Sequence, residues 1–264
     1  MTDSSDDGVL TDDRVLSLIG HLEELRKRII ISLIALGVGM ALCFIFKSWL
    51  LQFLITPLGD KKLITLSPTE SFMTVFKVAG YAGMIIASPV IIYQIWAFIA
   101  PGLKTKEKRV VMFSTVFTTI LFLCGIAFAW YLVLPRGLGF LMSYEDEVFN
   151  QQVQASKYFT FVAFFLLGFG LIFELPAMIL TLVRVGVVDV PTLRKNRKYA
   201  ILIGTVASAA LTPGQDLFSM LAMAIPFVLL FEVSLIFARF IKRPEKKKEA
   251  VEVIDDGPDD EAAG

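Results

Sequence analysis

Four apolar runs, each about as long as a membrane crossing, constrain what this chain can fold into more than any other feature. A helix needs about 20 mostly apolar residues to cross a hydrocarbon layer about 30 Å thick. Because that layer holds no water, every backbone N–H and C=O inside it must be bonded within the protein. The runs are residues 29–46, 75–100, 110–134 and 159–183. With 56% hydrophobic residues in 264, well above the roughly 45–50% of soluble domains, the chain is predicted to be an all-α membrane protein.

Two further apolar runs follow near the C-terminus. YAILIGTVASAAL, residues 199–211, has 13 residues and would form about 20 Å of helix, which is short for a crossing. Residues 217–238 follow after the turn TPGQD, in which Asp216 is placed to cap the next helix. The pair forms either a re-entrant hairpin or two helices in a locally thinned bilayer. Thinning is favoured because basic residues hold one end at a charged surface, and we expect six transmembrane helices with the last two short.

Basic residues divide unequally between the two sides of the predicted bundle. Nineteen Lys and Arg residues lie in the N-terminal segment, the loops after the second and fourth spans and the C-terminal segment, against five on the opposite side. Since cytoplasmic segments carry the excess of positive charge, six spans place both termini in the cytoplasm. We expect a transmembrane domain over residues 21–240, with disordered cytoplasmic tails over residues 1–20 and 241–264.

The stretch HLEELRKRII, residues 21–30, places carboxylates among bases at the start of the first span. As a helix it pairs Glu23 with Lys27 and Glu24 with Arg28 at i,i+4, each pair being worth about 0.2–0.5 kcal/mol. One interpretation is an interfacial helix whose acids are neutralised by their own bases. The other is that a carboxylate is held at the membrane surface to bind a cation from another molecule.

A second carboxylate, Glu107 in WAFIAPGLKTKEKR, is predicted to lie on the same cytoplasmic face. Glu107 could simply complement the dipole of the third span, which Thr105 would cap. Two surface carboxylates beside Trp96 and Phe98 could instead bind guanidinium groups through bidentate hydrogen bonds and stacking. The residues alone leave both interpretations open.

Two acids lie inside predicted spans, Glu174 in FGLIFELP and Glu232 in LLFEVS. A charged side chain near the bilayer centre costs about 3 kcal/mol, so it faces protein or water and marks a candidate functional site. Glu174 suits a proton relay or neutral packing, and we interpret Glu232 as packing. The single histidine, His21, lies outside the spans, and the sequence contains no HExxH, GxSxG or P-loop motif. We therefore predict no enzyme, no metal site and no cofactor.

A series of short motifs follows the order found in one family of membrane proteins. The motifs are HLEELRKR, SPTESF, SPVIIYQIWAFIAPGLKTKEKR, FGLIFELP, LRKNRKYA, LTPGQD and AIPFVLLFE. Together they closely resemble the TatC family, the polytopic core subunits of the twin-arginine protein translocase. The resemblance implies six transmembrane helices in a curved, glove-shaped bundle in the prokaryotic plasma membrane. TPGQD is one residue longer than the family's common TPPD, and Met220 stands where many relatives carry glutamine.

The resemblance also implies a binding site for the arginine pair of a signal peptide. Glu24 and Glu107 would bind the two arginines. The pocket around them would be shaped by Arg26, Phe98 and Pro101.

Other residues receive roles elsewhere in the bundle from the same resemblance. Glu174 would be the buried acid of the concave face, and Pro57 and Glu70 would belong to a cap on the outer side. The single-span partner TatB or TatA would dock at the fifth and sixth helices, against Thr212, Asp216 and Met220.

The predicted function is that of a non-enzymatic receptor for twin-arginine signal peptides and an assembly platform for the translocase. It would export folded proteins with the proton motive force, together with TatA and TatB in a multimeric TatBC-type complex within membrane lipid, and without nucleic acid. The alternative is a proton-coupled small-molecule transporter that uses Glu174. The residues alone do not favour either function over the other, although the sequence shows no clear internal repeat of the kind that marks many transporters.

Overall fold

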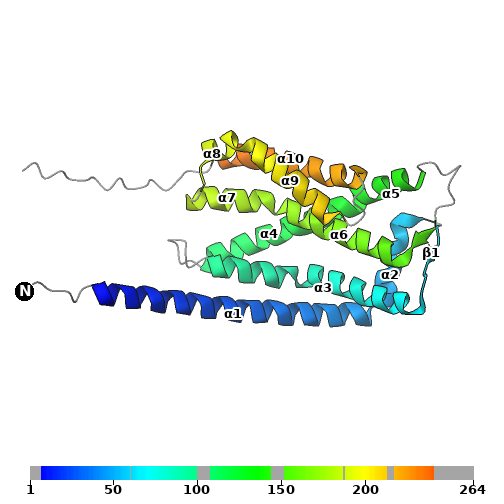
Figure 1. Cartoon of the computed structure of the whole chain (residues 1–264), viewed down its shortest axis with the longest axis horizontal. Coiled ribbons are helices and arrows are strands. Elements are labelled where there is room, and N and C mark those ends of the chain that lie inside the picture. Colours follow the sequence, from blue (N-terminus) through cyan, green and yellow to red (C-terminus); the bar gives the residue numbers. More distant parts are fainter. Residues whose placement is uncertain are drawn as a thin grey trace, which may run out of the picture.

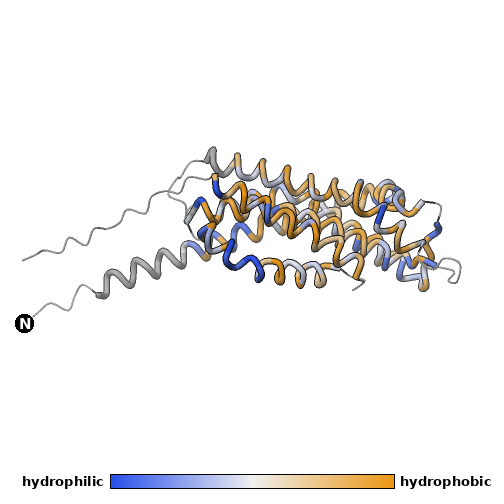
Figure 2. Tube along the Cα trace, turned by 90° about the horizontal axis from the view of Figure 1, so that it is seen from above, coloured by the Kyte–Doolittle hydropathy of each residue, from blue (hydrophilic) through white to orange (hydrophobic). Residues whose placement is uncertain are grey.

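The computed structural model describes residues 7–59, 61–99, 108–143, 152–186, 188–212 and 217–240, with the backbone alone described for residues 7–19, 108–111 and 185. The predicted site residues Pro101, Glu107 and Asp216 lie outside these ranges, as does the predicted tail over residues 241–264. Within them the chain is almost entirely helical. The apolar residues lie along the middle of the bundle and hydrophilic residues gather towards its two ends (Figure 2).

The longest helix, α1 (Asp7–Ile45), runs alongside α3 (Pro68–Ile99), the second span (Figure 1). The two backbones meet at Gly39 and Gly83. A Cβ atom on Gly83 would lie 2.5 Å from the backbone nitrogen of Met40, and one on Gly39 would lie 2.7 Å from the carbonyl oxygen of Gly83. Small residues allow this approach between membrane helices, where van der Waals packing replaces the hydrophobic effect.

The start of α1 corrects the prediction that residues 1–20 form a disordered tail. The helix begins at Asp7, so residues 7–20 belong to it. Nucleation is the costly step of helix formation, and once the apolar span has formed, each added residue gains a hydrogen bond at little cost. Polar composition alone therefore did not predict where this helix begins.

The third span is built from α4 (Lys108–Phe128), η3 (Ala129–Val133) and α5 (Leu134–Ser143). The middle element is a wide, π-helical turn directly before Pro135. Proline has no N–H for the preceding turn and its ring crowds the carbonyl four residues earlier, so a widened turn lets the helix continue. The span therefore reaches Ser143, beyond the predicted end at residue 134.

The fourth span consists of α6 (Ala155–Phe173) and α7 (Leu175–Val185), separated only by Glu174. Pro176 stands in the first turn of α7, where its missing N–H removes no helical bond. Gly186 ends α7 with φ 80°, a left-handed conformation that glycine adopts without steric cost. The short helix α8 (Val190–Lys195) follows.

The last two spans are α9 (Arg197–Leu211), with 15 residues, and α10 (Leu217–Ala238), with 22. Among the described residues, five helical segments are long and apolar enough to cross a membrane; α10 is the shortest of them, and α9 is shorter still. The end of α9 and the start of α10 fall short of the end of the bundle where α2 lies (Figure 1). The predicted all-α membrane fold is thus confirmed, with five helical segments in the described part of the chain long enough to cross a membrane and a shorter apolar helix, α9, in the place of the predicted fifth span.

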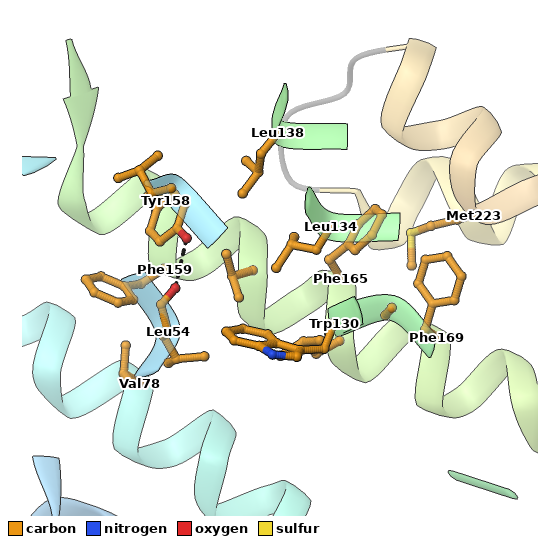
Figure 3. Packing of buried hydrophobic residues seen from close by; sticks show 14 of the residues in the cluster. Leu54, Val78, Trp130, Leu134, Leu138, Tyr158, Phe159, Phe165, Phe169 and Met223 are labelled. Carbon is orange, nitrogen blue, oxygen red and sulfur yellow. Dashed lines mark hydrogen bonds between the residues drawn. The ribbon is translucent and has the colours of Figure 1, made fainter. Parts of the chain in front are cut away.

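A small cap closes one end of the bundle, which we call the cap end. It contains α2 (Lys47–Ile55), η1 (Thr56–Leu58) and the two-residue parallel strands β1 (Leu63–Ile64) and β2 (Val153–Gln154). The buried Tyr158 hydroxyl on α6 donates a hydrogen bond of 2.8 Å to the Leu54 carbonyl and fixes α2 to the bundle (Figure 3). The opposite end, where α1 passes the level of α8, we call the basic end.

Helix α6 lies at the centre of the fold and packs against α3, α4, α9 and α10. Its side chains Val162 and Phe169 have no exposed surface. Around them Trp130 and Leu134 of the third span and Met223 of α10 complete the main core (Figure 3). The bundle is therefore organised around one buried helix, whereas α1 touches mainly α3.

The α1–α3 crossing yields a stability prediction. Gly83→Ala should destabilise the protein by about 1–3 kcal/mol, because the added methyl group meets backbone rather than a movable side chain. The apparent Tm in detergent measures this effect. Gly80→Ala is the matched control, since a Cβ atom there has nothing within 4 Å; equal melting temperatures for the two variants would contradict the close crossing.

Candidate functional site

A cluster of polar and aromatic side chains joins α1 to α3 at the basic end. It comprises His21, Glu24 and Arg28 of α1 with Gln94 and Phe98 of α3, and we call it the α1–α3 cluster. On each helix the members follow a spacing of three or four residues, which places them on one face. The predicted site residues Glu24 and Phe98 are thus brought to the same place.

Glu24 is bonded by a base of its own helix, as the i,i+4 spacing predicted. Nε of Arg28 donates to Oε1 of Glu24 at 3.1 Å, and Nη2 of Arg28 pairs with the same oxygen. The other oxygen, Oε2, lies 3.8 Å from Nδ1 of His21. This contact is longer than an ordinary hydrogen bond, so among the described residues Oε1 is firmly bonded by Arg28 while Oε2 has only the weak contact with His21.

Arg28 also reaches across to the second span. Its Nη1 donates to Oε1 of Gln94 at 3.2 Å, and the Gln94 side chain is buried, with 9% exposed. The guanidinium therefore links the carboxylate of α1 to a fixed acceptor on α3. Arginine suits this role because its planar group presents several N–H donors in a rigid fork.

Phe98 joins the cluster through His21, which lies beside the Glu24 carboxylate. Its ring stacks on His21 with centroids 4.3 Å apart and planes 14° apart. Arg26, on α1, is exposed. Trp96 does not join the cluster: its indole N–H donates to Oγ1 of Thr118 at 3.2 Å and ties α3 to α4.

Glu70 connects two parts of the cap. It stands in the first turn of α3, as the motif SPTESF predicted. Its Oε2 accepts the N–H of Leu66 at 2.7 Å, and its Oε1 accepts the N–H of Ser156 at the start of α6 at 3.2 Å. Pro57 lies in η1 and is half-buried. Pro57 therefore lies in the cap, and Glu70 joins the segment after β1 to the start of α6.

The two acids inside the spans have different surroundings. Glu174 lies at the break between α6 and α7; its Oε1 is buried, and no described group forms a hydrogen bond with it. Glu232 of α10 forms an ion pair with Arg197 at the start of α9. This pair supports the interpretation of Glu232 as a packing residue, and leaves Glu174 as an acid with an unpartnered oxygen among the described residues.

The predicted partner-docking residues at the last two helices are mostly covered. Thr212 is 2% exposed; its hydroxyl donates to the Ser208 carbonyl at 2.7 Å and lies 3.5 Å from Sδ of Met223. Met220 is half-buried. In this conformation Thr212 can affect docking only by shaping the end of α9. The exposed large hydrophobic side chains of α9 are Tyr199, Leu202, Ile203 and Val206.

An apolar cavity of about 660 Å³ lies towards the cap end. Side chains of α1, α2, α3, the third span and α6 line it, among them Phe53, Tyr81 and Trp130. The rings of Phe53 and Trp130 stack with centroids 4.3 Å apart. Within the described residues, no group of three or more His, Cys, Asp and Glu side chains is arranged to hold a metal ion.

Sequence reasoning missed Gln94 as a site residue. The signal was present, since Gln94 is a polar residue within the apolar run VIIYQIWAF, and such residues in membrane helices usually have a partner inside the protein. His21 was set aside because it is the single histidine and lies outside the spans. Neither partner could be identified before the α1–α3 packing was known.

The fold and this site define a polytopic helical membrane protein with a polar cluster at one end and a cap at the other. A family model described as "Sec-independent protein translocase protein (TatC)" matches residues 20–226. The chain is 40% identical to the TatC protein of Carboxydothermus hydrogenoformans over 236 residues, covering 89% of this chain and 97% of that protein. It is 37% identical to the TatC protein of Aquifex aeolicus, covering 89% and 98%.

A solved structure agrees with these relatives. The crystal structure of the twin-arginine translocase receptor TatC superimposes with a TM-score of 0.77 at 37% identity, covering 83% of this chain and 98% of that one. The chain therefore belongs to the TatC family of Sec-independent protein translocase components. Its function is in protein transport.

The cap yields a prediction about Glu70. In Glu70→Gln, the amides of Leu66 and Ser156 should exchange with deuterium at least about tenfold faster, because a carboxylate that accepts two N–H groups is replaced by an amide with one oxygen and a donor. Hydrogen–deuterium exchange of the protein in detergent measures this. Glu23→Gln, at an exposed acid of α1, is the control; unchanged exchange in Glu70→Gln would show that Glu70 does not hold the cap.

Proposed function

We propose that this protein is the receptor for twin-arginine signal peptides and the assembly platform of its translocase. The basic end faces the cytoplasm of a prokaryotic cell, with both termini on that side of the plasma membrane. A folded precursor's signal peptide binds there through its arginine pair. The carrying observation is the Glu24 carboxylate, whose Oε2 is not bonded by Arg28, next to the stacked rings of His21 and Phe98.

The chemistry of a guanidinium ligand supports this site. A planar cation of this kind bonds carboxylates through parallel N–H groups and stacks on aromatic rings. Glu24 offers a carboxylate oxygen and Phe98 offers the ring. We assign Glu107 as the second carboxylate and Arg26 and Pro101 as residues that shape the pocket, by their match to the family's motifs. Because Arg28 neutralises part of the charge on Glu24, a second acid is needed to bind two arginines.

The sidedness of the charges supports the orientation. The start of the apolar part of α1, the short helix α8 and the end of α10 lie at the same end of the bundle (Figure 1). The exposed bases of α8 and the start of α9 are Arg194, Lys195, Arg197 and Lys198. An excess of Lys and Arg near the ends of membrane helices marks the cytoplasmic side.

The short last pair of helices is the proposed docking surface for a single-span TatB or TatA subunit. Helix α9 is about 22 Å long and exposes Leu202, Ile203 and Val206. A partner helix can pack on this face while Thr212 fixes the end of α9 from within and Met220 and Asp216 lie at the start of α10 or just before it. The complex is proposed to contain several copies and to use the proton motive force.

The bound signal peptide is proposed to insert from the basic end towards the apolar cavity beneath the cap. The aromatic and aliphatic lining of the cavity suits an apolar segment of the peptide rather than a charged one. The concave, glove-shaped surface expected of the bundle would place Glu174 along this route. Pro57 and Glu70 hold the cap that closes it.

Peptide binding tests the receptor function. Glu24→Ala and Glu107→Ala should each weaken binding of a twin-arginine signal peptide at least about tenfold, which corresponds to the loss of one charge-assisted hydrogen bond. Glu107→Lys should weaken binding further, because like charge then repels the ligand. Dissociation constants of the purified protein for a synthetic peptide measure these effects.

Glu23→Ala serves as the control for these variants because it removes an exposed acid from the same helix. The control should bind as the unsubstituted protein does. Full binding by a folded, membrane-inserted Glu24→Ala, Glu107→Ala double variant would refute the receptor site.

The unpartnered oxygen of Glu174 favours one second candidate, a proton-coupled transporter. We expect Glu174→Gln to retain signal-peptide binding and protein export, since glutamine keeps the shape and polarity of the side chain but carries no titrating proton. Export of a twin-arginine substrate from cells measures this. Loss of export with intact peptide binding would instead support a proton relay through Glu174.

A further inference from the structure

Arg28 bonds Glu24 in an uneven way. Both Nε and Nη2 of the guanidinium contact the same oxygen, Oε1 of Glu24, while Nη1 points to Gln94 on the neighbouring helix. A bidentate pair would instead occupy both carboxylate oxygens. This arrangement uses one oxygen, Oε1, and leaves the second, Oε2, with only the 3.8 Å contact to Nδ1 of His21.

We propose that Arg28, held by Gln94, is a positioning residue that fixes the Glu24 carboxylate with Oε2 open to the guanidinium of a ligand. The proposal rests on the receptor function above and assigns two residues to it. Neither Arg28 nor Gln94 touches the ligand. They act by holding the acceptor that does.

The contact to Gln94 distinguishes this group from an ordinary surface ion pair. An exposed i,i+4 pair contributes little and leaves both side chains free to move. Here the Arg28 side chain is only 21% exposed, and Gln94 is buried on a helix that packs against α1 along its length. A buried acceptor on a second helix therefore limits the positions that the guanidinium and its carboxylate partner can take.

The choice of a neutral acceptor on α3 follows the same logic. The Gln94 amide oxygen accepts one hydrogen bond from Arg28 and leaves its ion pair with Glu24 intact. Lysine in place of Arg28 would keep the charge but could not hold both acceptors in one plane. Oε2 of Glu24 lies 3.8 Å from Nδ1 of His21, whose ring stacks on Phe98.

Two variants test the positioning role. Gln94→Leu keeps the size and buried character of the side chain but removes the acceptor, and Arg28→Lys keeps the charge but removes the fork. Each is measured for binding of a signal peptide with an Arg-Arg pair and of its Lys-Lys version. We expect each variant to bind the Arg-Arg peptide about tenfold more weakly while Lys-Lys binding stays unchanged, so that discrimination between the peptides collapses.

Two further variants serve as the rescue and the control. Gln94→Glu retains an acceptor for Arg28 and should preserve discrimination. Thr118→Val removes the hydroxyl that accepts a hydrogen bond from the Trp96 indole. This bond joins α3 to α4 and is 3.2 Å long, as is the bond between Arg28 and Gln94. Because it lies outside the α1–α3 cluster, it should leave both affinities unchanged.

The outcomes separate this inference from the proposed function. If the unsubstituted protein does not prefer the Arg-Arg peptide, or Glu24→Ala binds it fully, the receptor site fails and the positioning role fails with it. If the unsubstituted protein prefers the Arg-Arg peptide and Glu24→Ala loses binding, but Gln94→Leu and Arg28→Lys bind like the unsubstituted protein, only the positioning role is wrong. Equal weakening for both peptides would show a purely structural effect, and tighter binding by Arg28→Lys would show that Arg28 competes with the ligand; either result overturns the proposal.

Discussion

The close contact between the backbones of α1 and α3 at Gly39 and Gly83 sets the geometry on which the candidate site depends. With a side chain at either glycine the helices would stand farther apart. At the basic end, the same pair of helices lies close enough for Arg28 to bond Gln94 and for His21 to stack on Phe98. Since α1 contacts little besides α3, this crossing is what fixes Glu24 relative to the rest of the protein.

The remainder of the bundle is arranged to leave polar chemistry at its two ends. The middle is filled by α6 and the aromatic and aliphatic side chains around it (Figure 3). At the cap end, the Glu70 carboxylate and the Tyr158 hydroxyl bond backbone groups of the segment after β1, of α6 and of α2. At the basic end, the polar groups bond one another across two helices. Buried polar groups are costly without partners, and among the described residues an oxygen of Glu174 is one exception, together with the hydroxyls of Thr74 and Thr119.

Several elements could be predicted from the sequence because each depends on local pattern. Helical spans, the start of α3 before Glu70 and the Glu24–Arg28 pair follow from apolar run length, capping and i,i+4 spacing. The continuation of the third span past Pro135 and the extension of α1 back to Asp7 were not predicted. A wide turn and a propagating helix depend on the chain around them rather than on the residues at the boundary.

By itself the sequence determined that this protein is a helical membrane bundle, which segments carry the excess of positive charge and to which family its motifs are similar. These follow from the absence of water in the hydrocarbon layer and from the side chains in order along the chain. Only the tertiary structure decided that Gln94 meets Arg28, that Thr212 is buried against Met223 and that Arg28 bonds only one oxygen of Glu24. Those facts depend on how helices far apart in sequence approach and rotate against one another. Small residues at the crossings allow a close approach, but the sequence does not show which helix each of them packs against.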